Sequence, residues 1–379
     1  MPAARSTSFN LARLAESLAI GAAGGFLFNL AHFPAGWLAG AMLFAAVAAL
    51  AGRTIAIPTP LARVCSVAVG ISIGSVARPE TVRGMADWPV SIVMVTVAMA
   101  AATFATVTYL MRVHGWNRMT AIFAGTPGGL NQVMAFATEE GRDCDIRGIA
   151  IVQTLRVVIL AICVPMVLSL SGFAGDARFP AGQVGIAQAP GEFLLLVAVA
   201  VAAAFSLVRL GFPGGLIFGP LMVSAILHGG AFMTVTMPPE ITSGAMVGLG
   251  VLTGGRFSGT PLRLLLGYLG AAFGSFAVSL VVVGAIALGV TAVVPLPPAG
   301  MIVAYAPGAV DAMMILSFAL NLDPVFVGAH HLTRVFVVSL GLPLLVYLFE
   351  PRDGQRRKTR DLRETIERRP AMDNLRDRK

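Results

Sequence analysis

Two arginines lie inside long apolar segments, at equivalent positions in the two halves of the chain. Both belong to one pattern, which reads Asp145-x10-Arg156-x8-Pro165 and then Asp323-x10-Arg334-x8-Pro343. A charged side chain at the centre of a bilayer costs about 2.5–3.5 kcal/mol even on the mildest scale, so an arginine there needs partners. Its recurrence at identical spacing predicts a duplicated membrane protein in which the arginine pair has a role.

The distribution of charge also indicates a membrane protein. Of the 379 residues, 56% are hydrophobic and 12% are charged, whereas soluble domains carry about 25% charged residues. Residues 350–379 hold 11 of the 27 Lys and Arg and 7 of the 19 Asp and Glu, and we interpret them as a charged cytoplasmic tail. The net charge of +8 then reflects basic loops and the tail. We therefore expect a multi-pass protein of the bacterial cytoplasmic (inner) membrane and no nucleic-acid partner.

Twelve apolar runs are long enough, or nearly long enough, to cross a bilayer. They are Leu11–Leu30, Pro34–Leu50, Leu61–Val76, Val90–Met111, Met119–Thr138, Gly148–Leu170, Phe193–Leu210, Gly214–Ala231, Ile241–Gly255, Leu264–Val290, Pro298–Leu320 and Val325–Phe349. Because Leu61–Val76 and Ile241–Gly255 are short, ten spanning segments is the alternative count. The predicted fold class is all-α, a polytopic membrane helical bundle of about 10–12 transmembrane segments.

The two halves match each other along most of their length. FPAGWLAG at 33–40 corresponds to FPGGLIFG at 212–219 with a shift of 179, and Gly70-x3-Gly74 corresponds to Gly250-x3-Gly254 with a shift of 180. The shift is 178 over the arginine segments. An offset that drifts this slowly predicts two internal repeats, and the paired glycines predict close helix approach. Whether the repeats are parallel or inverted stays open.

The same correspondence predicts the domain organisation. Residues 1–32 are an N-terminal tail and first helix, 33–170 the first membrane repeat, 171–211 a connector and linking helix, 212–349 the second repeat, and 350–379 the tail.

Each repeat contains an apolar element interrupted by Pro-Gly, at Gly125–Phe136 and Ala304–Leu316. Unwound backbone at membrane depth is tolerated only where it is buried or lines a wet cavity, and paired interruptions indicate a transporter's central site. A Pro kink that serves packing alone is the alternative. The candidate substrate-binding residues at the breaks are Thr126, Pro127, Gly128, Gly129, Asn131, Pro307, Gly308 and Asp311.

Polar residues precede both arginines by one helical turn. Gln153 lies three residues before Arg156, and His331, with its neighbour His330, precedes Arg334 in the same way. We add Arg156, Arg334, Gln153 and His331 to the candidate substrate-binding residues, because cations and polar groups facing a bundle interior suit an anion. The alternative is that each arginine only satisfies carbonyls of a broken helix. Asp145 and Asp323 are predicted helix N-caps.

No arrangement of residues predicts catalysis. The chain has five histidines and three scattered cysteines, and neither metal-ligand spacing nor a nucleophile or phosphate-binding motif occurs. We therefore expect neither an enzyme nor a metal, and no catalytic residue or cofactor is proposed.

These motifs resemble those of the AbrB-type duplicated integral membrane protein family. The resemblance lies in three motifs and their counterparts, over about Phe33–Pro165 and Phe212–Pro343. They are PGGLNQVM at 127–134 with PGAVDAMM at 307–314, the D-x10-R helix that ends in Pro in both halves, and the FPxGxLxG opening at 33–40 with FPGGLIFG at 212–219. It implies a bacterial inner-membrane protein linked to regulation of gene expression; labels of ammonia monooxygenase in this family lack metal ligands here. An acidic residue commonly follows PGGx in the family. In this chain Asn131 stands there in the first repeat, followed by Gln132, and Asp311 in the second, followed by Ala312, with Ala309 in place of the second glycine.

The expected function is secondary transport of a small anionic solute through a site at the bilayer midplane, between the two repeats. In that interpretation the arginines attract the anion and the breaks offer backbone N–H groups. His331 or Asp311 would carry protons. The alternative is a membrane-embedded regulator of gene expression, a sensor or scaffold whose tail contacts a cytosolic partner. A homo-oligomer is compatible with either function.

Overall fold

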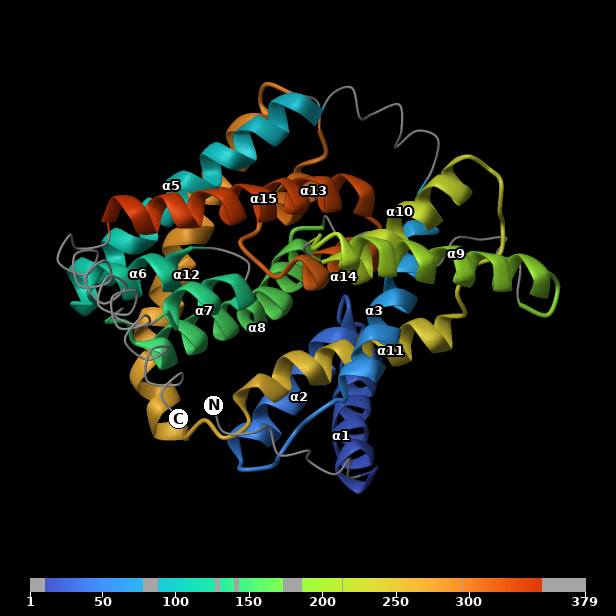
Figure 1. The fold of residues 1–379 in the computed structure, drawn as a ribbon, viewed down its shortest axis with the longest axis horizontal. Coiled ribbons are helices and arrows are strands. Elements are labelled where there is room, and N and C mark those ends of the chain that lie inside the picture. Colours follow the sequence, from blue (N-terminus) through green and yellow to red (C-terminus); the bar gives the residue numbers. More distant parts are fainter. Residues whose placement is uncertain are drawn as a thin grey trace, which may run out of the picture.

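The computed structural model describes residues 11–77, 88–126, 130–139, 143–172, 186–212, 214–294 and 296–349, apart from the side chains of Asn131, Gln132 and Asp311. Within these ranges every regular element is a helix (Figure 1). The predicted all-α class is therefore confirmed.

The helices of the first half run from α1 to α8. They are α1 (Leu11–Leu30), α2 (Gly36–Leu50), α3 (Thr59–Gly74), α5 (Trp88–His114), α6 (Arg118–Gly125), α7 (Leu130–Ala137) and α8 (Ile146–Leu170).

The helices of the second half have nearly the same lengths, in the same order, as those of the first half. They are α9 (Pro190–Arg209), α10 (Gly215–Gly229), α11 (Pro239–Gly254) with the short 3-10 turn η2 (Gly255–Phe257), α12 (Leu262–Thr291), α13 (Pro298–Tyr305), α14 (Val310–Ala319) and α15 (Pro324–Phe349).

Six helices of the described ranges are long and apolar enough to cross a membrane, so the chain is a multi-pass membrane protein. They are α1, α5, α8, α9, α12 and α15. Four further helices, α2, α3, α10 and α11, have 15 or 16 residues. The two remaining apolar runs, 119–138 and 298–320, are each divided into two short helices. The predicted interruptions are thus confirmed, and they fall where Pro and Gly break the helical hydrogen-bond ladder.

Glycines let the short helices of the two halves of the chain pack closely against one another. α2 packs on α11, and α3 packs on α10. A Cβ atom on Gly254 would lie 2.3 Å from the carbonyl oxygen of Met42, and one on Gly74 would lie 2.4 Å from that of Leu221. Only a residue without a side chain lets backbones approach this closely. The predicted role of the paired glycines in close helix packing is confirmed.

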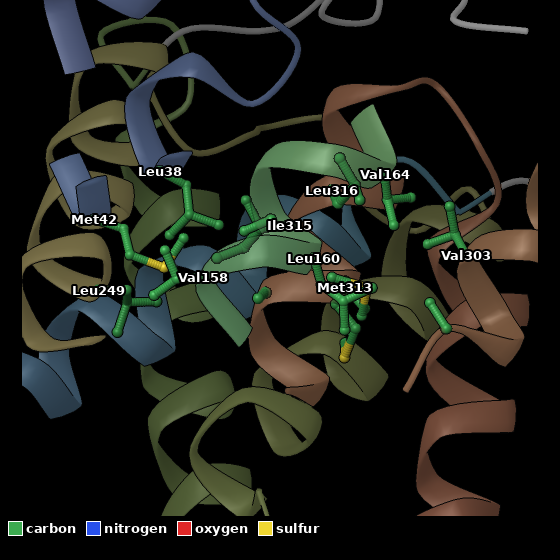
Figure 2. Close-up of a cluster of buried hydrophobic side chains, with 14 of the residues drawn as sticks. Leu38, Met42, Val158, Leu160, Val164, Leu249, Val303, Met313, Ile315 and Leu316 are labelled. Carbon is green, nitrogen blue, oxygen red and sulfur yellow. The ribbon is translucent and has the colours of Figure 1, made fainter. Parts of the chain in front are cut away.

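The arginine helices, α8 and α15, lie in a second part of the molecule, together with α5, α12 and the four short helices of the interrupted elements. Figure 2 shows where the two parts meet. Met313 and Ile315 of α14 lie beside Val158 and Leu160 of α8, and Leu38 of α2 reaches the same cluster. α14 of the second half therefore contributes to one hydrophobic core with α8 of the first half.

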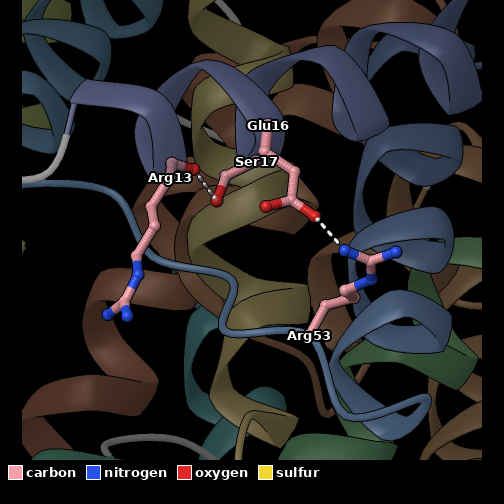
Figure 3. Close-up of polar contacts among 4 residues, drawn as sticks. All are labelled: Arg13, Glu16, Ser17 and Arg53. Atoms are coloured by element: carbon pink, nitrogen blue, oxygen red, sulfur yellow. Dashed lines mark hydrogen bonds and ion pairs between the residues drawn. The ribbon is translucent and has the colours of Figure 1, made fainter.

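An ion pair joins α1 to the segment that follows α2 (Figure 3). Arg53 donates to Glu16 at 3.1 Å, and the two side chains are 68% and 42% exposed. The hydroxyl of Ser17 donates to the carbonyl of Arg13 at 2.8 Å and accepts the backbone N–H of Ala56 at 3.2 Å. These contacts fix the peripheral helix α1 and lie away from the interrupted elements.

Candidate functional site

The first interrupted element is a re-entrant hairpin, because α6 and the segment after α7 meet at one end. The side-chain amide of Asn117, which caps α6, donates to the carbonyl of Asp143 at 2.9 Å. Thr120 in the first turn of α6 accepts the backbone N–H of Asp145, the cap residue of α8, at 3.0 Å. The chain therefore descends along α6, turns, and returns to the same side before α8 begins.

Gln153 and Arg156 of α8 bind the C-terminal end of α6. The Gln153 amide donates to the carbonyls of Phe123 and Thr126 at 2.7 and 3.3 Å. The Arg156 guanidinium donates to the carbonyls of Ala124 and Thr126 at 2.7 and 3.5 Å. The last carbonyls of a helix have no intrahelical partner and carry partial negative charge. Both side chains are buried, and together they satisfy this helix end.

The second interrupted element has the same construction. The His331 imidazole lies 3.0 Å from the carbonyl of Val303, measured from its Nε2. The Arg334 guanidinium donates to the carbonyl of Ala306 at 2.6 Å and also to that of Gly308. Val303 contacts His331, and Ala306, three residues later, contacts Arg334, also three residues later. Because both pairs advance in the same direction, α13 runs parallel to α15.

Three buried nitrogen atoms of this cluster have no hydrogen-bond partner among the residues that the structure describes. They are Nε of Arg156, Nε of Arg334 and Nδ1 of His331. The two arginines are 2% and 1% exposed, and the charge of Arg156 acts unfavourably on that of Arg334. Neither is in an ion pair with a described carboxylate. A buried unpaired donor costs free energy comparable to a lost hydrogen bond, and more when charged. The cluster therefore presents positive charge and two unused guanidinium donors, whereas Nδ1 of His331 is an acceptor, because Nε2 donates to the carbonyl of Val303.

The two hairpins begin at opposite ends of the molecule, as their contacts with the long helix α5 show. Trp88 in its first turn packs against Phe326 in the first turn of α15, with ring centroids 5.4 Å apart. Beyond its other end, Trp116 packs against Tyr268 at 5.9 Å, and the Tyr268 hydroxyl donates to Asp145, the cap of α8. The 27 residues of α5 span about 40 Å, so α8 and α15 start on opposite sides.

The predicted site residues fall into two groups, one at each hairpin. Arg156, Gln153 and Thr126 meet at the first hairpin, and Arg334, His331 and Gly308 meet at the second. Pro307 is buried between them and α14. Pro127, Gly128 and Gly129 lie outside the described residues, as do the side chains of Asn131 and Asp311. Sequence reasoning missed the carbonyl acceptors of Phe123, Ala124, Val303 and Ala306, because backbone groups carry no sequence signal.

His330 contacts different residues from those that its neighbour His331 contacts. Its Nδ1 lies 2.8 Å from the carbonyl of Phe326, and its Nε2 lies 2.8 Å from the hydroxyl of Ser91 on α5. The Tyr305 hydroxyl donates to the carbonyl of Ser91 at 2.6 Å. Adjacent residues of a helix point about 100° apart, so His331 faces α13 while His330 joins α15 to α5. The predicted caps are present, with Asp145 accepting from Gly148 and Asp323 from Val325.

Together, the spanning helices and the two arginine-bound interrupted elements define an α-helical membrane protein with a buried cationic centre. A family model described as "Transition state regulatory protein AbrB" matches residues 37–350. The chain therefore belongs to the AbrB family.

Two curated proteins are similar to this chain over most of their length. "Uncharacterized protein YhjN" of Bacillus subtilis (strain 168) is 24% identical over 370 residues, which is 90% of this chain and 94% of the relative. "Putative regulator AbrB" of Escherichia coli (strain K12) is 25% identical over 321 residues, or 84% of this chain and 91% of the relative. The match to the family model, over residues 37–350, covers both arginine helices.

Proposed function

We propose that this protein transports a small anion across the bacterial inner membrane, through a site between the tips of the two hairpins. The observation that carries the proposal is the unused Nε–H donor of Arg156 and of Arg334, both buried and without a partner among the described residues. Two guanidinium groups that repel each other become favourable neighbours when an anion lies between them. Charge-assisted hydrogen bonds from guanidinium nitrogens would hold that anion.

Opposite hairpin directions support an alternating-access mechanism. We infer that the chain consists of two inverted repeats, because α8 and α15 start on opposite sides and the glycine contacts of α3 with α10 recur between α11 and α2. With re-entrant hairpins, each half contributes five crossings, and an odd number inverts the second half. Inverted repeats with interrupted helices near the midplane are a recurrent architecture of secondary transporters, in which one unit moves against the other around a shared site.

The inferred repeat includes the first helix of each half. α1 and α9 both have 20 residues, and their starts differ by 179 positions. A Cβ atom on Gly40 would meet the carbonyl of Gly24, and one on Gly219 would meet that of Ala203, which is the equivalent position. The repeat unit would then be α1–α8 and α9–α15, with the connector between them.

The helix ends at the two tips leave the centre positively charged. The C-terminal ends of α6 and α13 carry partial negative charge, and the N-terminal ends of α7 and α14, which follow the breaks, carry equal positive charge. These partial charges cancel one another, so the two guanidinium groups leave a net positive charge at the centre. A small anion with one or two negative charges fits this balance.

The test is anion-dependent thermal stabilisation of the purified full chain in detergent, followed by flux of the best anion in reconstituted vesicles. A panel of chloride, sulfate, phosphate, acetate and dicarboxylates serves as the probe. A ligand at 100 times its Kd stabilises the folded state by about 2.7 kcal/mol. The key variants are Arg156→Gln and Arg334→Gln, each of which removes one guanidinium group, and the control is His331→Gln.

The reciprocal positions supply the control. Gln153 already binds the carbonyls of its own hairpin through an amide, so His331→Gln keeps a donor towards Val303 and removes only the unpaired Nδ1. We expect it to remain folded and to keep its affinity for the anion, because Nδ1 of an imidazole that donates from Nε2 is an acceptor and gives an anion no hydrogen bond. Arg156→Gln and Arg334→Gln should lose the response entirely. An anion that stabilises the wild type and all three variants equally would exclude this site.

A second candidate function is regulation of gene expression, and the name of the Escherichia coli relative favours it. A regulator would transmit a signal through a cytosolic partner, for which the tail at 350–379 is the sequence candidate. Deleting residues 352–379 separates the two functions. A transporter should keep its anion flux without the tail, whereas a scaffold should lose its effect on transcription.

A further inference from the structure

A lateral groove runs along one face of the molecule, between α5, α6 and the second half of α15. Its volume is about 560 Å³. Apolar residues form most of its walls, among them Phe104, Val107, Ile122, Leu342 and Leu345. None of them belongs to the arginine cluster described above. Thr126 is the one residue of that cluster that lines the groove.

The groove opens towards the lipid rather than towards water. Phe104 lies near the middle of the membrane-spanning helix α5 and is 75% exposed, and Leu344 on the opposite wall is 57% exposed. The wall on α5 extends from Thr96 to Arg112, which corresponds to about 24 Å of helix. A bilayer's hydrocarbon core is about 30 Å thick, so an acyl chain from one leaflet could lie along the groove.

One end of the groove is cationic. Arg112 and Arg118 line it there, where α5 ends and α6 begins and hence at a membrane surface. The Arg118 guanidinium lies 5.2 Å from the ring centroid of Phe349, which holds it over the groove mouth. Neither arginine is in an ion pair with a described residue. Guanidinium groups bind phosphate through paired hydrogen bonds.

We propose that this groove is a binding site for an anionic phospholipid. The phosphate lies between Arg112 and Arg118, and one acyl chain occupies the groove between α5 and α15. The charge at the mouth and the apolar, lipid-facing walls together select this class of ligand over a soluble anion or a peptide. Thr126 also lines the groove, and its carbonyl binds Arg156. The lipid would thus support the hairpin tip from outside.

The charge requirement is tested by native mass spectrometry of the full chain in detergent, with phosphatidylglycerol and phosphatidylcholine of identical acyl chains. We expect the wild type to prefer phosphatidylglycerol by about tenfold or more, from the attraction of two surface arginines. The variant Arg112→Gln/Arg118→Gln should lose that preference. The matched control is Arg209→Gln/Arg263→Gln, because Arg209 also stacks on an aromatic ring, 4.5 Å from Phe205, and lies outside the groove.

The shape requirement is tested separately by filling the groove. Gly341 lines it, and a Cβ atom there would meet no other atom within 4 Å, so Gly341→Phe should fold and occupy the space of the acyl chain. Gly284→Phe on α12 is the control, because its Cβ position is equally free and is not part of the groove. We expect Gly341→Phe to bind phosphatidylglycerol at least tenfold more weakly, and Gly284→Phe to bind it normally.

Four outcomes overturn the proposal. Equal binding of both lipids to the wild type removes the charge selection, and equal binding to Gly341→Phe and Gly284→Phe removes the groove. Inorganic phosphate that raises the melting temperature as much as phosphatidylglycerol does would identify a soluble-anion site. A dimer that disappears only in Gly341→Phe would make the groove an interface between copies of this chain.

Discussion

Replacing either of two corresponding glycines by alanine should destabilise the protein. The two single variants should lose the same amount of stability. The perturbations are Gly74→Ala in α3 and Gly254→Ala in α11. A Cβ atom on Gly74 would lie 2.4 Å from the carbonyl oxygen of Leu221 and 2.6 Å from the Cβ of Ser224. A Cβ atom on Gly254 would lie 2.3 Å from the carbonyl oxygen of Met42. Both clashes involve backbone atoms, which cannot rotate away.

The magnitude follows from the distance that the helices must give. Ordinary contact begins at 3.4 Å, so each pair has to separate by about 1 Å. A gap of 0.5–1 Å forfeits a quarter to a half of each dispersion contact along the seam, and overpacking typically costs about 1–3 kcal/mol. We expect a loss of about 2 kcal/mol in the free energy of unfolding for each variant. The two losses should agree within about 0.5 kcal/mol, since the contacts correspond.

The assay is equilibrium unfolding in mixed detergent micelles with increasing sodium dodecyl sulfate, followed by far-UV circular dichroism. The control is Gly244→Ala in the same helix α11, where a Cβ atom would meet nothing within 4 Å. Alanine has the higher helix propensity, so this control should be neutral or stabilising by up to about 1 kcal/mol. If Gly74→Ala and Gly254→Ala unfold like the control, the glycines do not set the helix spacing. A large loss at only one of them would refute the equivalence of the two seams.

Three smaller predictions concern polar contacts outside the arginine cluster and use the same unfolding assay. Asp323→Ala removes the acceptor for Val325 N at 2.9 Å and should cost about 1 kcal/mol, whereas Asp323→Asn should recover most of it; equal losses would contradict a capping role. Tyr305→Phe removes the bond to the carbonyl of Ser91 and should cost about 0.6–1 kcal/mol, against no change for Tyr347→Phe, whose ring is 70% exposed. Arg53→Gln breaks an exposed ion pair and should change stability by less than about 1 kcal/mol, with any loss vanishing in high salt.

Most of the helical framework could be predicted from the sequence, because hydrophobic length is a direct requirement of the bilayer. Each of the twelve apolar runs corresponds to one helix or to one interrupted pair. What the sequence left open was the path of the interrupted elements. Twenty apolar residues at 119–138 fit a crossing as well as a hairpin of two eight-residue helices. The contact of Asn117 with Asp143 decides between them, and it depends on tertiary structure.

The site was predictable in its residues and less so in their roles. Arg156 and Arg334 were identified because a charge in an apolar run is rare and its repetition is rarer. Both interpretations of these arginines, carbonyl binding and solute binding, were open from the sequence. The hydrogen bonds to Thr126 and Ala306 establish the first without excluding the second. Because the two arginines come from segments 178 positions apart, the unfavourable action of one charge on the other required the folded structure.

The contrast between Gln153 and its neighbour Arg156 bears on why the positive charges are retained. Gln153 satisfies the carbonyls of Phe123 and Thr126 with a neutral amide, so capping this helix end does not require a cation. Each buried arginine nevertheless costs about 2.5–3.5 kcal/mol relative to a neutral residue, and the two repel each other. Carbonyl binding offsets part of this cost and gives no reason for the charge itself. An anion that spends part of the transport cycle between the two guanidinium groups would supply that reason.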